Sequence, residues 1–256
     1  MLTVVWAEAA LQLRVLRRTP DRMLPLVVVP LLTAAILTIT QNAGRADLAG
    51  TAVVGTAIIG IWGFAIYIAG DIIESERWLG TLEGVITTPA PFVVTLLARI
   101  ATVTAVSFAS IAESAFVADV FFGVHPAVHH KLLFTLTLAC TWLAMTGTAL
   151  TMSGLFVLTR AIGTYQNALT YPFYVLSGAV TPISLLPGWL HPLSRIVFLS
   201  WSADLLRACM TSGGVADPAK GIIAILVLGV AGAGIGLWST SVILRRMYRL
   251  GTIGHL

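Results

Sequence analysis

Several apolar runs in the sequence are too long and too free of charge for a soluble domain. One of them, Leu48–Gly70, has 23 residues without a charged side chain, and about 20 apolar helical residues suffice to cross a bilayer. Because lipid offers no partners for backbone N–H and C=O groups, such runs fold as helices. Hydrophobic residues make up 57% of the chain and charged residues only 10%, against about 25% charged residues in a soluble domain. The sequence therefore predicts an all-α polytopic membrane protein.

We expect a single transmembrane domain, residues 1–256, with six spans and both termini on the same side. The predicted spans are Met23–Thr40, Leu48–Gly70, Phe92–Ala118, Leu132–Thr159, Ala161 to about Gly178, and Gly221–Leu244. With both termini in the cytoplasm, ten basic residues face inward and five face outward, as the positive-inside rule requires. The inner set is Arg14, Arg17, Arg18, Arg22, Arg77, Arg99, Arg160, Arg245, Arg246 and Arg249, and the outer set is Arg45, Lys131, Arg195, Arg207 and Lys220.

Residues 1–22 precede the first span and carry an amphipathic pattern. Apolar residues recur at helical spacing, and Arg14, Arg17 and Arg18 cluster near the end. This pattern predicts a helix in the membrane interface with its arginines directed toward anionic headgroups. A frayed basic tail is the alternative reading. A cleavable signal is not expected, because the apolar run that follows is of full span length.

The run Ala161–Ser194 is uncharged over 34 residues, which is too long for one simple helix. Prolines interrupt it at positions 172, 182, 187 and 192. We interpret it as a fifth span followed by a broken, partly re-entrant extracellular segment, residues 179–219. Within this segment, Ile196–Met210 is expected to form a further short helix.

The stretch Asp71–Pro89 is a charged island between apolar runs. It holds four of the eleven carboxylates of the chain, at Asp71, Glu74, Glu76 and Glu83. On a helical wheel, Trp78 shares an apolar face with Leu82 and Val85, and Glu83 lies on the opposite face with the remaining polar residues. The topology places this island in the cytoplasm. It is expected to be a short surface helix that receives force from a soluble partner.

The residues argue against several kinds of chemistry within this chain. A phosphate-binding loop needs a lysine followed by Ser or Thr, but Lys131 and Lys220 are followed by Leu and Gly. The scattered basic residues form no stripe for nucleic acid, and no Gly-x-Ser-x-Gly elbow occurs. His125, His129 and His130 lie near each other, but Pro126 interrupts a helix there and no cysteine completes a metal-ligand set. Any ATP that is used must therefore be bound elsewhere.

Three other features allow hypotheses. Glu113 and Asp119 could relay protons, since intramembrane acids are costly and often functional, and a proton-coupled transporter or channel is thus the alternative function. Arg99 is interpreted as a snorkelling interface anchor. The glycines of the last span, at positions 229, 232, 234 and 236, predict close helix packing.

Two stretches carry a family resemblance. Glu76–Pro89, ERWLGTLEGVITTP, resembles the first cytoplasmic loop of ABC-2-type transporter permeases, in which Glu-Arg-x-x-Gly-Thr-Leu-Glu precedes Thr-Pro. Leu176–Arg207 resembles their extracellular signature, in which Leu-Ser-Gly, a proline, Leu-Pro-x-Trp-Leu and a late Asp-x-Leu-Arg recur. The signature residues are Leu176, Ser177, Gly178, Pro182, Leu186, Pro187, Trp189, Asp204 and Arg207.

The resemblance, closest to the daunorubicin and multidrug-resistance-like group, implies the permease subunit of an ATP-driven exporter in the plasma membrane. The permease would form a homodimer or a heterodimer with a homologue, bind two ATPase subunits that hold ATP and Mg²⁺, and export an amphipathic drug, antibiotic or lipid-like molecule. The first and fifth spans would line the dimer interface and the substrate path. The residues expected to dock the ATPase are Glu76, Arg77, Gly80, Thr81, Leu82 and Glu83.

Overall fold

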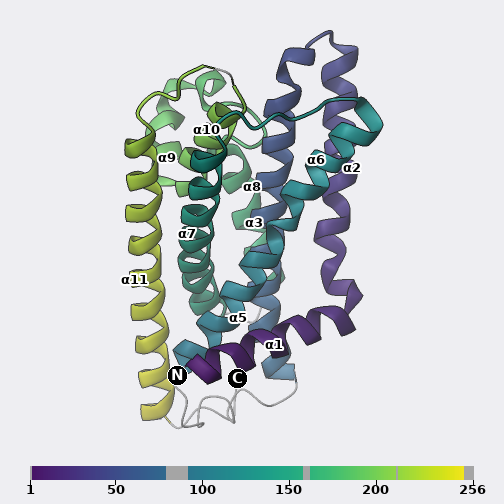
Figure 1. The fold of residues 1–256 in the computed structure, drawn as a ribbon. Helices are drawn as coiled ribbons and strands as arrows, with labels where there is room; N and C mark the ends of the chain where they lie inside the picture. Colours follow the sequence, from purple (N-terminus) through teal and green to yellow (C-terminus); the bar gives the residue numbers. More distant parts are fainter. Residues whose placement is uncertain (1, 79–91, 158–161, 212, 251–256) are drawn as a thin grey trace.

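All regular elements are helices in the part of the chain that the computed structural model describes, residues 2–78, 92–157, 162–211 and 213–250. The helices pack into an upright bundle, with α1 lying across one end and α9 and α10 at the other (Figure 1). We call these the α1 end and the α10 end. The elements are α1 (Leu2–Arg18), η1 (Pro20–Met23), α2 (Leu24–Asn42), η2 (Ala46–Leu48), α3 (Ala49–Trp78), α5 (Phe92–Ser107), α6 (Ala109–Phe122), α7 (Lys131–Val157), α8 (Ile162–Leu176), η3 (Ile183–Leu185), η4 (Gly188–Leu190), α9 (His191–Ile196), α10 (Phe198–Met210) and α11 (Pro218–Leu250).

Five helical stretches among the described residues are long and apolar enough to cross a membrane. They are Pro20–Asn42, Ala49–Ile72, Phe92–Phe122, Lys131–Phe156 and Pro218–Val242. Each coincides with a predicted span, so the prediction of a helical membrane protein is confirmed. The predicted fifth span corresponds to α8, which has only 15 residues, fewer than the roughly 20 that a full crossing needs. The six-span layout therefore stays a prediction.

The third span consists of two helices, α5 and α6, that meet at Phe108. Three hydroxyls near the junction donate to backbone carbonyls three or four positions earlier: Thr104 Oγ1 to Ile100 O, Ser107 Oγ to Thr104 O, and Ser110 Oγ, across the junction, to Ser107 O. Such back-bonding competes with the backbone ladder and bends helices. The run of Thr and Ser explains why one apolar span is built from two helices.

Helix α3 occupies the centre of the bundle. Of its most apolar 18-residue window, 78% is buried, against 22% for the corresponding windows of α2 and α11. Small residues allow its neighbours to approach: a Cβ on Gly60 would lie 2.5 Å from Ser110 Oγ, and one on Gly70 would lie 2.1 Å from Gln166 Nε2. Trp62 stacks on Phe173 with ring centroids 4.0 Å apart. The core is therefore organised around α3.

The glycines of the last span mediate its contact with α7. A Cβ on Gly229 would lie 2.6 Å from the Ala144 backbone, and one on Gly236 would lie 2.8 Å from Thr151 N. The Thr151 hydroxyl also donates to Gly232 O at 2.6 Å. The predicted close packing is confirmed at these three glycines.

Two ion pairs attach the N-terminal segment to the bundle. Glu8 of α1 accepts from Arg99 of α5 at 2.7 Å, and Asp71 of α3 pairs with Arg22 of η1 at 2.9 Å. The Arg99 side chain is only 12% exposed, so the interpretation of Arg99 as a snorkelling anchor is wrong. Its charge is engaged by a carboxylate on a neighbouring helix. Residues 1–22 begin with a helix, as predicted, and this helix lies across one end of the bundle (Figure 1); its position in the membrane interface stays a prediction.

Candidate functional site

The charged island begins inside α3. This helix does not stop at Gly70 but continues to Trp78, so Asp71–Trp78 forms the last two turns of the central helix and not a separate surface helix. Among the predicted coupling residues, Glu76 and Arg77 belong to these turns. The other four, Gly80, Thr81, Leu82 and Glu83, lie outside the described residues. Their docking role stays a prediction.

Both flanks of the predicted coupling loop are attached to the N-terminal segment. Asp71 lies two turns before the end of α3, and Arg99 lies two turns after the start of α5. Each holds a partner from the first 22 residues, through the Asp71–Arg22 and Arg99–Glu8 pairs. Because all four side chains are at most 26% exposed, water screens these pairs less than surface pairs. The two helix ends on either side of residues 79–91 are thereby braced against the same N-terminal segment, through η1 and α1.

The first half of the extracellular signature forms a tight turn after α8. Gly178 has φ +71°, a conformation that favours glycine. The buried Ser177 hydroxyl accepts a hydrogen bond from Ala179 N at 3.3 Å and donates to Tyr174 O at 3.1 Å. Arg207 Nη2 donates to Gly178 O at 2.6 Å. The structure thus brings the signature residues Gly178 and Arg207 into direct contact, in a turn that Ser177 stabilises.

This turn rests directly on α3 at Gly55. A Cβ at position 55 would lie 2.2 Å from Ala179 O and 3.6 Å from Arg207 Nη2. Only a glycine leaves room for the turn at this distance. Position 55 was not singled out from the sequence, because nothing local distinguishes this glycine from the others in α3.

Asp204 does not pair with Arg207. It accepts from Arg195 Nη1 at 2.7 Å. The Arg195 guanidinium lies 4.5 Å from the Trp201 ring centroid, and Trp201 Nε1 donates to Arg195 O at 3.0 Å. These contacts fasten α9 to α10. Arg195 and Trp201 are functional candidates that the motif comparison missed.

The remaining signature residues shape the connection between α8 and α9. Pro182 and Pro187 precede η3 and η4 with extended ψ angles of 139° and 140°, and Leu186 O accepts from His191 Nε2 at 3.0 Å. Leu176 packs against the core, whereas Trp189 is 71% exposed. The segment is broken as predicted.

Helix α10 enters the bundle. Eight of its 13 residues are buried, and Thr141 of α7 donates to Ser202 of α10 at 2.8 Å. The loop before α7 closes over its end, where Cys209 O accepts from His129 N at 3.0 Å. The short helix predicted at Ile196–Met210 is thus present as α10, and the re-entrant position of this segment stays a prediction.

The two acids of the alternative hypothesis are not brought together. Asp119 pairs with the exposed His125, whereas Glu113 Oε2 is buried and has no hydrogen-bond partner among the described residues. No direct hydrogen bond joins Glu113 and Asp119 in the described part of the chain.

A polar face is left uncovered on α8. Tyr165 and Tyr171 are 54% and 68% exposed, and Tyr67 of the adjacent α3 is 44% exposed. Thr164 and Asn167 are also exposed on α8. Phenol, hydroxyl and amide groups are costly against hydrocarbon unless a polar surface meets them. This face, defined by Tyr67, Thr164, Tyr165, Asn167 and Tyr171, is hereafter the α8 face.

Comparison with curated protein sequences gives no match. The family model described as "ABC-2 type transporter" matches residues 3–211, which include α1, both flanks of the predicted coupling loop and the whole segment from the Gly178 turn to α10. The match agrees with an all-helical bundle containing several membrane-length helices. The chain therefore belongs to the ABC-2 type transporter family and is the membrane-embedded permease component of an ABC transporter.

Proposed function

We propose that the chain couples ATP hydrolysis by a separate ATPase subunit to export of an amphipathic molecule, such as a drug, an antibiotic or a lipid-like compound. Membership of the family implies pairing with an ATPase. The observation that carries the proposal is the α8 face, because its tyrosines and amide offer polar groups and ring surfaces together on a helix that is hydrogen-bonded to the membrane-length stretch of α3. An amphipathic cargo needs both kinds of contact.

In this proposal, a second copy or a homologue faces the α8 face, and the cargo passes between the two. The fifth predicted span would then line the path, as the family resemblance implies. The α1 end would face the cytoplasm of a plasma membrane, since the count of ten basic residues against five favours it. Both α1 and the end of α11 lie at that end of the bundle (Figure 1), which agrees with two cytoplasmic termini.

The experiment begins with purification of the tagged chain from its own membranes, together with any bound subunits. We expect an ATPase subunit to co-purify, and we expect vesicles reconstituted with the complex to transport cargo only with ATP and Mg²⁺. Glu76→Ala and Gly80→Val should uncouple hydrolysis from transport while leaving the protein inserted. Normal transport by both variants would contradict the coupling role.

The α8 face is tested separately. Asn167→Leu should reduce transport while leaving the bound ATPase in place, because it removes a polar group from the path and not from the docking loop. Asn42→Leu is a matched control, since Asn42 is also exposed but ends α2. Equal transport by the two variants would contradict the assignment of the path. Transport by the chain alone, driven by a pH gradient and abolished by Glu113→Gln, would favour the proton-coupled alternative.

A further inference from the structure

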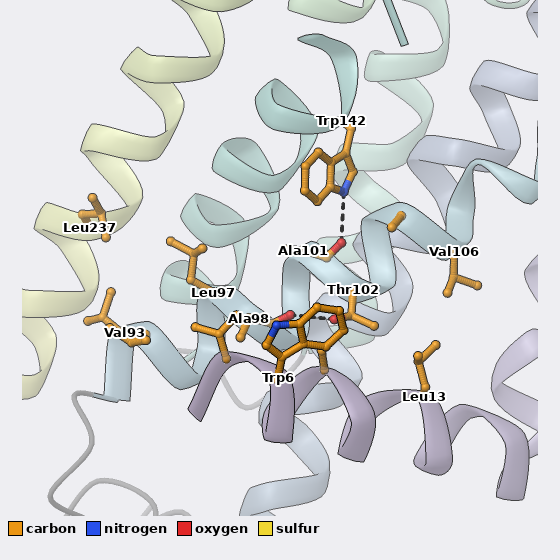
Figure 2. A pocket seen from close by; sticks show the side chains of 14 residues that line it. Trp6, Leu13, Val93, Leu97, Ala98, Ala101, Thr102, Val106, Trp142 and Leu237 are labelled. Atoms are coloured by element: carbon orange, nitrogen blue, oxygen red, sulfur yellow. Dashed lines mark hydrogen bonds between the residues drawn. The ribbon is translucent and has the colours of Figure 1, made fainter. Parts of the chain in front are cut away.

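An apolar groove runs between α1 and α5 at the α1 end. Its volume is about 720 Å³, within the range of ligand sites. Trp6 and Leu13 of α1 form one wall, residues of α5 from Val93 to Val106 form the floor, and Trp142 of α7 and Leu237 of α11 close the far side (Figure 2). Nothing in the proposed transport path uses this groove.

The lining of the groove is almost entirely apolar. Apart from the indole N–H of Trp6, on a side chain that is 75% exposed, its polar groups are engaged with the α5 backbone: Thr102 Oγ1 donates to Ala98 O at 2.8 Å, and Trp142 Nε1 donates to Ala101 O at 3.0 Å (Figure 2). Every other lining side chain is aliphatic or aromatic. The part of a ligand that enters the groove must therefore be a hydrocarbon chain, because a buried polar group would find no partner.

The dimensions of the groove fit one leaflet. The α5 residues that line it span 14 positions, or roughly 20 Å of helix, which is enough to cover one leaflet, or about 15 Å, of a hydrocarbon core of about 30 Å. Helix α1, which supplies one wall of the groove, lies across the end of the bundle (Figure 1). Its apolar side is uncovered there, with Trp6 75% exposed and Leu13 39% exposed. A chain that enters beside α1 thus runs along α5 toward the middle of the bundle.

Positive charge borders the mouth. Arg14, Arg17 and Arg18 are exposed, and none of them forms an ion pair with another described residue. Arg17 follows Leu13 by one helical turn and so lies on the same face of α1. The only acidic residue of this helix, Glu8, is already paired with Arg99. The rim therefore presents uncompensated positive charge beside an apolar groove.

We propose that this groove is a binding site for an anionic phospholipid, with one acyl chain along α5 and the phosphate against the arginines at the end of α1. A bound lipid would contact α1 and α5 together and would hold them at a fixed separation. This site is independent of the α8 face, and its test requires neither an ATPase nor a transported substrate.

The test uses the full chain in vesicles that contain phosphatidylglycerol or phosphatidylcholine with a photoactivatable diazirine in the acyl chain. After irradiation, labelled peptides are identified by mass spectrometry. We expect phosphatidylglycerol to label α1 and α5 in the groove several-fold more than phosphatidylcholine does. Arg17→Gln should lower this preference about fivefold, which is the typical effect of one basic residue at an anionic surface. Equal labelling by the two lipids would overturn the proposal.

A second pair of variants tests the groove itself. Ala105 lines the groove and is exposed, so Ala105→Phe should block the acyl chain without disturbing the core. Ala35→Phe is the matched control, because Ala35 is an exposed alanine of α2 outside the groove. We expect Ala105→Phe to abolish groove labelling and Ala35→Phe to leave it unchanged. Persistent groove labelling in Ala105→Phe, or equal loss of labelling in Ala105→Phe and Ala35→Phe, would overturn the site.

Discussion

Gly55→Ala perturbs the contact between α3 and the Gly178 turn. The new Cβ would lie 2.2 Å from Ala179 O, whereas real Cβ contacts stay beyond about 3.0 Å, so the turn must retreat by about 0.8 Å. Overpacking of this kind costs about 1–3 kcal/mol, and loss of the Arg207–Gly178 bond adds about 1.5–3 kcal/mol. The gain in helix propensity offsets about 0.5–1 kcal/mol. We expect a net destabilisation of about 2–5 kcal/mol.

The assay is thermal unfolding of the purified protein, followed by intrinsic tryptophan fluorescence. For a chain of this size, the expected loss corresponds to a Tm decrease of roughly 5–15 °C. Gly50→Ala is the control in the same helix, because a Cβ there would meet only Met210 Sδ at 3.9 Å; its Tm should not fall. In an Arg207→Gln background, Gly55→Ala should cost less, since the hydrogen bond is already lost. Equal Tm values for Gly55→Ala and Gly50→Ala would refute the reasoning.

Three further outcomes are expected in the same unfolding assay. Gly236→Val should lower Tm by several degrees, because a Cβ there lies 2.8 Å from the α7 backbone. Gly234→Val should leave Tm unchanged, since position 234 faces open space. A larger Tm decrease for Gly234→Val than for Gly236→Val would contradict the packing of α11 on α7. Glu8→Gln should destabilise by about 1–3 kcal/mol, since it removes the 2.7 Å ion pair that joins α1 to α5, and a double-mutant cycle with Arg99→Gln should show coupling between the two residues. Gln166→Leu removes two donors to α3 carbonyls, each at 3.0 Å, and should cost about 1–2 kcal/mol.

The membrane spans could be predicted because their signal is local. A run such as Leu48–Gly70 needs only its length and lack of charge to be recognised, and it corresponds to a membrane-length helix. Where the helix ends is decided by other forces. Asp71 stays within α3 because Arg22 from another element pairs with it, and the sequence around Asp71 contains no sign of that partner. The sequence pattern therefore predicts that the helix ends at Gly70, whereas α3 continues to Trp78 and includes the first residues of the charged island.

Residues 179–219 likewise combine features that local sequence predicts with contacts that only packing decides. Prolines predicted that the chain breaks after α8, and a short helix was expected at Ile196–Met210, where the structure has α10. That Arg207 returns to Gly178 could not be predicted, because the two residues are 29 positions apart and the bond depends on how α10 inserts. Gly55 is one of 23 glycines, and only the packed bundle distinguishes it. Motifs identified residues of the site, whereas packing determined their partners.

Helix α3 links the two regions that the motifs identified. It has 30 residues, or about 45 Å of helix, with the Gly178 turn packed near one end and the predicted coupling residues Glu76 and Arg77 at the other. Between them, Gly60 and Gly70 are in such close contact with neighbours that no side chain could be added without displacement. A close-packed helix of this kind transmits displacement as a rigid body and does not absorb it by local bending. In the proposed mechanism, a push by the ATPase on the end of α3 would therefore reach the Gly178 turn, and Gly55→Ala should alter transport without weakening ATPase binding.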